Sequence, residues 1–147
     1  MKRPIPQKLP HMRKQGLIID DLPDEVLVYD LDRHRAHCLN STSALVWRHC
    51  DGYTSAREIA ERLQRELQAP IAEELVWLAL RDLERLHLLE DSISLPPRLA
   101  GMSRREMVRA FGVAAAVAIP LAVSLISPTA AQAQTGGKPH PEGGPKR

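Results

Sequence analysis

The spacing of apolar residues changes once along this chain, near residue 40, and this change limits the possible folds more than any other feature. Before it, three short runs rich in β-branched residues are separated by turns that contain Asp and Pro: LIID at 17–20, EVLVYD at 25–30 and RAHCL at 35–39. After it, apolar residues recur every three or four positions, which is typical of helices. The order predicts an α+β domain with a small antiparallel sheet followed by three helices.

Capping residues mark the first two helices. Asn40 or Ser41 is suited to cap the first helix, and Gly52 suits the left-handed turn that follows it. Ser55 and Glu58 form a capping box, in which each side chain accepts a hydrogen bond from the other residue's backbone N–H. The second helix is therefore expected to begin directly after Ser55.

The third helix is predicted to start near Pro70 and to end at about Leu86. Its apolar face is wider than a surface helix needs to pack on one core. Three residues widen that face on one side: Val76, Leu80 and Leu83. The helix is either well buried, or this side lines a groove for a partner. Asp82 falls inside the apolar face, so its carboxylate must be hydrogen-bonded to a backbone donor or be strained.

Charge is distributed unevenly along the chain. Residues 17–97 hold 16 acidic and 8 basic residues, whereas residues 1–16 hold five basic residues and no acidic one. DNA binding depends on Lys and Arg side chains that neutralise phosphates, so the acidic body is not expected to bind nucleic acid. Residues 1–16 contain three prolines and no apolar period. They are predicted to be a flexible basic arm in front of a folded body at residues 17–95.

The cysteines and histidines do not form a metal-binding pattern. Cys38 and Cys50 lie near several histidines, but no C-x-x-C or H-E-x-x-H spacing is present. No metal and no other cofactor is therefore expected. The chain also lacks a glycine-rich phosphate loop and a nucleophile paired with a base, so it is not expected to be an enzyme. We see no signal peptide at the N-terminus and expect the body to lie in the reducing cytoplasm.

The C-terminal third has the features of an export signal placed behind a domain. A basic linker at 96–109 contains Arg104 and Arg105, which resemble a twin-arginine motif, and Ala131 and Ala133 form an A-x-A site for signal peptidase. Between them, residues 110–126 are 17 uncharged residues, at the lower end of the ~17–25 that span a bilayer. We predict a transmembrane helix at 110–126 and a disordered tail at 127–147.

Three interpretations of this C-terminal region are open. The apolar helix tethers the body to a membrane, with the body on the cytoplasmic side because basic residues precede the helix. Alternatively, it is an export signal fused behind the domain, with the short tail as cargo. A third interpretation is an apolar helix docked on the body. We favour the tether because the run is long enough to span.

The body also resembles a known family. The segment EVLVYDLDRHRAHCLNSTSALVWRHCDGYTSAREIAERL, followed by VWLALRDLERLHLLED, is similar to the PqqD-like family over about residues 17–91. The resemblance lies in a strand pair, the Leu39–Asn40 step, a helix containing Trp47, the Asp-Gly turn, and a final helix that ends in LHLLE. His87 departs from the pattern, because the family has glycine in that turn.

The resemblance implies a fold and a function. The fold is winged-helix-like, with a three-stranded antiparallel sheet packed on three helices. The family binds the leader of a ribosomally made precursor peptide by strand addition and presents it to a modifying enzyme, often a radical SAM enzyme. A DNA-binding winged helix is the main alternative, and the acidic body argues against it.

We map the peptide site onto two elements of this sequence. The receiving edge is the third predicted strand, comprising Arg35, Ala36, His37, Cys38 and Leu39. The apolar wall is formed by Val76, Leu80 and Leu83 of the third helix. An exposed edge of this kind offers unpaired N–H and C=O groups to an added strand.

Overall fold

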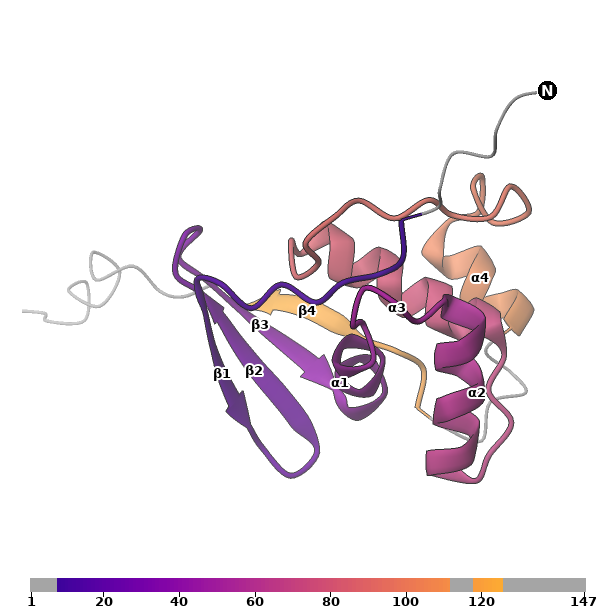
Figure 1. The fold of residues 1–147 in the computed structure, drawn as a ribbon, viewed down its shortest axis with the longest axis horizontal. Helices are drawn as coiled ribbons and strands as arrows, with labels where there is room; N and C mark the ends of the chain where they lie inside the picture. Colours follow the sequence, from indigo (N-terminus) through magenta and orange to yellow (C-terminus); the bar gives the residue numbers. More distant parts are fainter. Residues whose placement is uncertain (1–7, 112–117, 126–147) are drawn as a thin grey trace, which may run out of the picture.

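The computed structural model describes residues 8–111 and 118–125, whose fold is shown in Figure 1. The strands are β1 (Leu17–Asp21), β2 (Glu25–Asp30), β3 (Arg35–Asn40) and β4 (Ala122–Leu125). The helices are α1 (Ser41–Arg48), α2 (Ala56–Leu67), α3 (Glu73–Arg85) and α4 (Arg104–Phe111). Within the described residues the α+β class is confirmed, and one strand is present that the sequence did not predict.

All four strands lie in one antiparallel sheet in the order β1-β2-β3-β4. The three predicted strands are confirmed as β1, β2 and β3, and they follow one another as hairpins. The additional strand, β4, comes from the C-terminal region and pairs with β3 from Ala36↔Leu125 to Leu39↔Ala122. β3 is therefore an interior strand, and β1 and β4 are the two edges.

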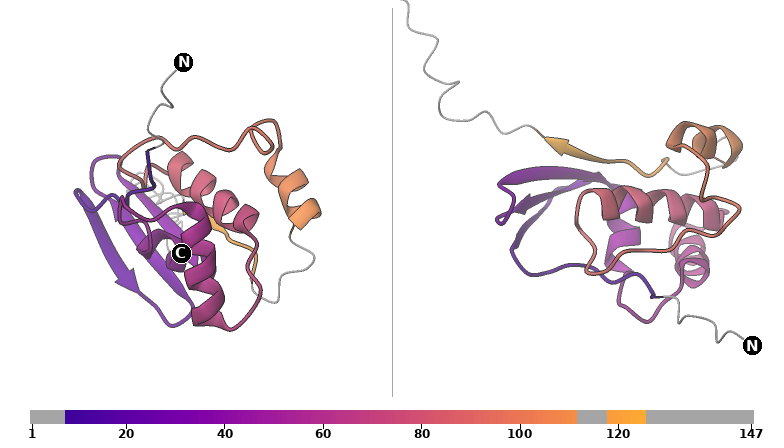
Figure 2. Two further views of the ribbon diagram at one scale, coloured as in Figure 1. Left: turned by 45° about the vertical axis from the view of Figure 1, so that its right-hand side comes forward. Right: turned by 90° about the horizontal axis from the view of Figure 1, so that it is seen from above.

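Helices pack on one face of the sheet. α1 lies against β2 and β3, α3 lies against β4, and α2 packs on α1 and α3, as Figures 1 and 2 show. Strand residues alternate accordingly, so Val26, Val28 and Leu39 are buried beneath the helices. The next residues along each strand point to the other face and are more exposed.

The helix signals in the sequence are mostly confirmed. Asn40 caps α1 by accepting a hydrogen bond from the Ser43 backbone N–H, and both bonds of the predicted Ser55–Glu58 capping box are present. α3 begins at Glu73, three residues after Pro70, because Ala72 has the extended conformation of an N-cap. The predicted start of this helix was therefore too early.

His87 ends α3 in the way that glycine ends many helices. Its φ of 59° is left-handed, which a non-glycine residue adopts at a cost. The His87 N–H donates to the Glu84 carbonyl and the Leu88 N–H donates to the Leu83 carbonyl, the pair of bonds that defines a Schellman motif. Histidine thus takes the backbone conformation that glycine adopts more easily.

Residues 8–16, part of the predicted flexible arm, are docked on the body. The Met12 N–H donates to the Cys50 carbonyl over 2.8 Å, and the Arg13 N–H donates to the Leu88 carbonyl over 3.0 Å. The segment therefore bridges the turn after α1 and the chain after α3. Residues 1–7 of the predicted arm lie outside the described residues.

A buried carboxylate fixes this segment to the sheet. Asp30, at the end of β2, has no exposed surface and accepts hydrogen bonds from both terminal nitrogens of Arg13, at 2.8 and 3.1 Å. The backbone N–H groups of Asp32 and Arg33 also donate to it. The Arg13 guanidinium is the main reason that the pKa of Asp30 lies well below its usual range.

The C-terminal region differs from the predicted transmembrane helix at 110–126. In the described residues α4 covers Arg104–Phe111, and residues 118–125 contain no helix, with Ala122–Leu125 forming β4. Pro120 gives a physical reason, because proline lacks the N–H that a helix interior needs. Residues 112–117 and 126–147 lie outside the described residues, and with them the predicted tail, Ala131 and Ala133. In the described part of the chain, no helix has both the length and the apolar character needed to cross a membrane.

Candidate functional site

The predicted receiving edge, β3, already carries an added strand. Its outer hydrogen-bonding side pairs with β4, a segment more than 80 residues later in the chain. Ala122 of β4 is buried opposite Leu39, whereas Val123, Ser124 and Leu125 are exposed. The contact is therefore a short backbone pairing with one buried side chain at its start.

Asn40 fixes the start of this added strand. Its backbone N–H donates to the Leu121 carbonyl, and its side-chain oxygen accepts from the Leu121 N–H. Its side-chain amide donates to the Ile119 carbonyl over 2.7 Å. Beside it, the Thr42 hydroxyl donates to the Ala118 carbonyl over 2.8 Å. These hydrogen bonds are made to backbone groups of the added segment, so they do not depend on its side chains.

α4 holds the other side of the same segment. Arg104 donates to the Pro120 carbonyl over 2.7 Å and lies 3.6 Å from the carboxylate of Asp82 on α3. Met107 of α4 is 1% exposed and belongs to the core. Arg104, predicted as half of an export motif, thus connects α3, α4 and residue 120, while Arg105 is exposed.

Asp82 is the buried acid that the sequence placed on the apolar face of α3. It is 3% exposed and is paired with Arg85 at 3.5 Å and with Arg104. One of its oxygens has no hydrogen bond to any described residue. Burial raises the pKa of Asp82, and the neighbouring arginines oppose that shift only in part. In the described residues the partners of this carboxylate are arginine side chains, which differs from the backbone donor that the sequence suggested.

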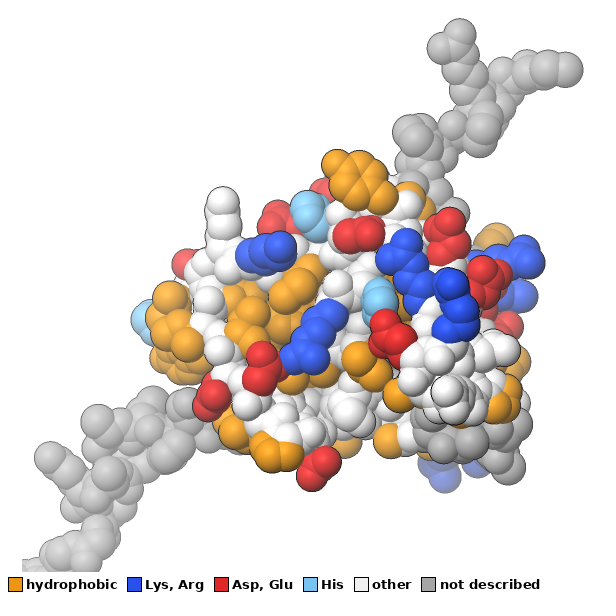
Figure 3. Space-filling model, turned by 60° about the horizontal axis from the view of Figure 1, so that its bottom comes forward, with side chains coloured by type: hydrophobic (Ala, Val, Ile, Leu, Met, Phe, Trp, Pro, Cys, Tyr) orange, Lys and Arg blue, Asp and Glu red, His pale blue; other side chains and the backbone are white. Residues whose placement is uncertain are grey.

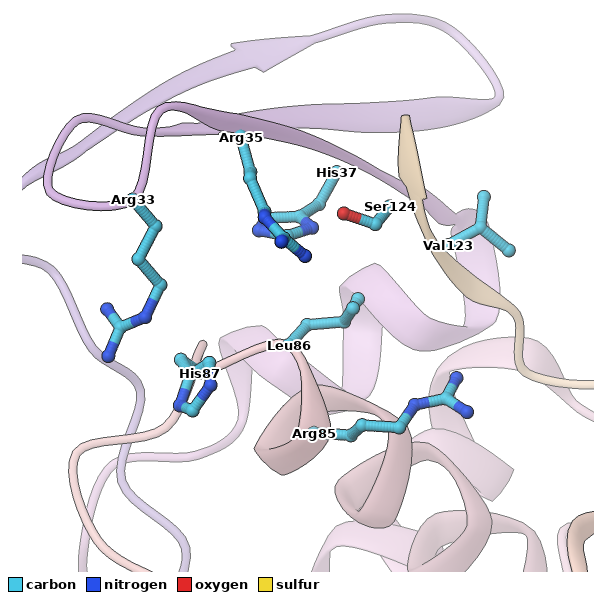
Figure 4. A pocket seen from close by; sticks show the side chains of 8 residues that line it. All are labelled: Arg33, Arg35, His37, Arg85, Leu86, His87, Val123 and Ser124. Carbon is cyan, nitrogen blue, oxygen red and sulfur yellow. The ribbon is translucent and has the colours of Figure 1, made fainter. Parts of the chain in front are cut away.

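A basic pocket of about 670 Å³ opens between β3, β4 and the end of α3, and Figure 4 shows its lining. Arg33, Arg35 and His37 come from β3 and the turn before it, Arg85, Leu86 and His87 from α3 and its end, and Val123 and Ser124 from β4. Among the described residues, none with an acidic side chain is part of the lining.

His37 is the buried polar group of this pocket. It is 2% exposed, yet neither ring nitrogen has a hydrogen-bond partner among the described residues. Burial lowers the pKa of His37, with Asp30 raising it and Arg35 lowering it further. An unsatisfied buried ring of this kind costs free energy unless a ligand or water completes it.

The residues mapped to the peptide site divide into two groups. The predicted strand is present as β3 with its outer side paired to β4. Of its side chains, Arg35 is exposed, Ala36 and Cys38 are half-buried, and His37 and Leu39 face the helices. The mapped wall of Val76, Leu80 and Leu83 has no exposed surface at all. With β4 and α4 in place, these three residues are part of the core and offer no surface to a peptide. Asn40 and Thr42, which bond to residues 118–121, and Arg85, which lines the pocket, were not part of that mapping, although Asn40 was visible as a cap.

The thiols are held in their neutral form. Burial raises the pKa of Cys50 to about 12, and burial together with a hydrogen bond to Glu25 raises the pKa of Cys38 to about 11. A neutral thiol is a poor nucleophile and a poor metal ligand. Among the residues that the structure covers, no three His, Cys, Asp or Glu side chains are grouped as a metal site would require.

Positive and negative side chains are mixed on the face seen in Figure 3. Lys and Arg side chains alternate with Asp and Glu side chains over the helical side, and hydrophobic side chains gather toward the sheet. A protein that follows a phosphate backbone presents a continuous basic stripe. This face therefore has no such footprint.

These features define a class: a small α+β domain whose sheet edge takes up an extended segment by backbone pairing. Residues 25–89 match the family described as Coenzyme PQQ synthesis protein D (PqqD). This part of the chain is a PqqD-like domain, as its sequence resemblance predicted. The family consists of non-catalytic, peptide-binding recognition elements that serve the biosynthesis of ribosomally made, modified peptides. No curated protein and no solved structure matched the chain.

Proposed function

We propose that this chain binds the leader of a ribosomally made precursor peptide by strand addition to β3. The pairing of β3 with β4 is the observation that carries the proposal, because it is the arrangement that a bound peptide would have. The backbone bonds from Asn40 and Thr42 support it further. They would hold an incoming segment of almost any sequence at its start.

A leader added in trans must first displace β4. The strand is four residues long, and three of them are exposed. Elements with few buried contacts open at a small free-energy cost compared with global unfolding. β4 therefore acts as a resident strand that a better ligand replaces.

The bound peptide is proposed to pass to a modifying enzyme, with a radical SAM enzyme as the candidate class. This part of the proposal rests on the family resemblance alone. A maturase gene and a short precursor gene beside the gene for this chain would support it. DNA binding is the alternative that a winged-helix-like fold would raise, and the mixed charge in Figure 3 argues against it.

Tethering to a membrane through residues 110–126 stays a prediction from the sequence. Residues 118–125 cannot pair with β3 and cross a bilayer at the same time, because one role needs an extended chain and the other a helix. If the tether exists, undocking β4 and inserting the segment are one event. The edge of β3 would then be free whenever the protein is anchored.

A reversible lock on β4 tests the peptide site. Val123 lies directly opposite Cys38 in the β3–β4 pair, at the separation that a disulfide between paired strands requires. The Val123→Cys protein, treated with an oxidant, should hold β4 on β3. The probe is a fluorescent peptide of residues 117–127, with the leader of any adjacent precursor gene as a second probe. Both should bind the reduced protein and lose at least tenfold in affinity on oxidation.

Ser124→Cys is the matched control, because residue 124 points to the opposite face of the sheet from Cys38. Its oxidation should leave binding unchanged. Equal binding to the locked and reduced Val123→Cys protein would show that the site lies elsewhere. No binding of either peptide in any state, together with tight binding of duplex DNA at moderate salt, would replace the proposal with the DNA-binding alternative.

A further inference from the structure

The basic pocket beside β4 contains hydrogen-bonding groups that β4 does not satisfy. Figure 4 shows the Ser124 hydroxyl directed toward the ring of His37 and the side chain of Arg35. No hydrogen bond joins Ser124 to His37, whose two nitrogens have no partner in the described part of the chain. Serine is therefore too short to satisfy the group that it faces.

The pocket has positive charge to spare. Arg33 is paired with Asp30 at 3.3 Å, and Arg85 is paired with Asp82 at 3.5 Å. Arg35 has no acidic partner among the described residues. The end of α3 adds partial negative charge from its last carbonyls, but the Schellman bonds occupy two of them. The balance favours an anionic group next to Arg35 and His37.

The register of the β3–β4 pair indicates which residue of an added strand would carry this anionic group. Ser124 is paired with His37, so both side chains lie on the same face of the sheet. A strand that replaced β4 in the same register would place its residue 124 equivalent at the mouth of the pocket. A Glu or Asp side chain there extends from the backbone toward a cavity of about 670 Å³.

We infer that this pocket receives the side-chain carboxylate of a peptide added to β3, at the register position that Ser124 has in β4. The inference deepens the proposed function, on which it rests, by naming the chemical class of residue that the leader carries. An acidic residue at that position gives an incoming leader an advantage over the resident strand. Charge-assisted hydrogen bonds from Arg35 to the carboxylate supply this gain in affinity. The same carboxylate accepts a hydrogen bond from His37 or orients its ring.

The resident strand itself provides the test. Ser124→Glu in the full chain places a carboxylate at the pocket without any added peptide. Hydrogen exchange of the β4 amides should become about tenfold slower than in Ser124→Gln, which has nearly the same shape and no charge, because one bond between charged groups is worth roughly a tenfold step or more. The slowing should disappear when Ser124→Glu is combined with Arg35→Gln.

In trans, a peptide of residues 117–127 with glutamate in place of serine should bind reduced Val123→Cys protein about tenfold more tightly than the parent peptide. Equal exchange rates for Ser124→Glu and Ser124→Gln would overturn the inference. So would a slowing that survives Arg35→Gln. These results leave the proposed function standing, because the lock on β4 tests strand addition without using the pocket.

A titration with free anions tests whether the pocket binds a small anion from solution instead of a peptide carboxylate. The ring signals of His37 can be followed by NMR while sodium acetate or inorganic phosphate is added to the unmodified chain. We expect weak, non-saturating changes, since neither ion is held in place by strand pairing. Saturation at low millimolar concentration that Arg35→Gln abolishes would make the pocket a free-anion site and overturn its assignment to a peptide side chain.

Discussion

Trp47 joins the first helix to the end of the third through one hydrogen bond. Its indole is 1% exposed, and its Nε1–H donates to the Leu88 carbonyl over 2.8 Å. That carbonyl lies just after His87, so the bond also holds the left-handed turn that shapes the pocket. A single side chain thus links the core to the candidate site.

Trp47→Ala should lower the free energy of unfolding by about 3–5 kcal/mol, enough to unfold much of a small domain. Trp47→Phe keeps most of the apolar volume and loses the bond to Leu88, so it should cost about 1–3 kcal/mol. Chemical denaturation followed by circular dichroism measures both. Trp77, which is 7% exposed and bonds to Glu73 within α3, is the control tryptophan. A Trp47→Ala protein that melts like its parent would contradict the core position.

At the scale of elements, the segment before β1 depends on the Arg13–Asp30 pair. The pKa of Asp30 lies below the usual 3.8 because of Arg13, so the carboxylate is more acidic in the folded than in the unfolded chain. Such a group stabilises the fold above the unfolded pKa, and the contribution is lost as pH falls below about 4 toward the folded pKa.

Asp30→Asn should therefore cost about 3–5 kcal/mol at pH 7, because it removes the buried carboxylate partner of Arg13 and leaves only the exposed carboxylate of Asp32. The difference from the parent should shrink as the pH is lowered from about 4 toward 2. Urea denaturation at several pH values gives the comparison. Asp91→Asn removes the exposed pair with Lys8 and should change stability little at any pH. A constant difference between parent and Asp30→Asn from pH 7 to 2 would rule out the ion pair as the cause.

At the scale of the whole molecule, residues 118–125 connect the peptide site to the predicted membrane tether. We expect the full-length parent to sediment with membranes after cell lysis, because residues 110–126 carry no charge. Oxidised Val123→Cys, in which β4 is held on β3, should shift to the supernatant and return after reduction. A parent found wholly in the supernatant would show that the tether prediction is wrong. A locked protein that still sediments would place the anchor outside 118–125.

The sequence by itself determined the elements whose signals are local. The three hairpin strands follow from short β-branched runs between turns, and α1 and α2 follow from Asn40 and the Ser55–Glu58 box, because these residues satisfy backbone groups a few positions away. The PqqD-like pattern is a fixed order of such signals. His87 was singled out because the family has glycine in that turn, and the turn does have a positive φ at His87.

Only the tertiary structure showed that Ala122–Leu125, part of the apolar C-terminal segment, pairs with β3. Residues 110–126 have no strand period, and the length of this uniformly apolar run favoured a membrane helix over a docked one. The choice of strand at Ala122–Leu125 depends on the free edge of β3, more than 80 residues away, and on the bonds from Asn40, Thr42 and Arg104. The basic pocket has the same origin, because its residues come from three elements that meet only after folding. Local sequence sets which backbone groups need partners, and long-range packing sets which partners they find.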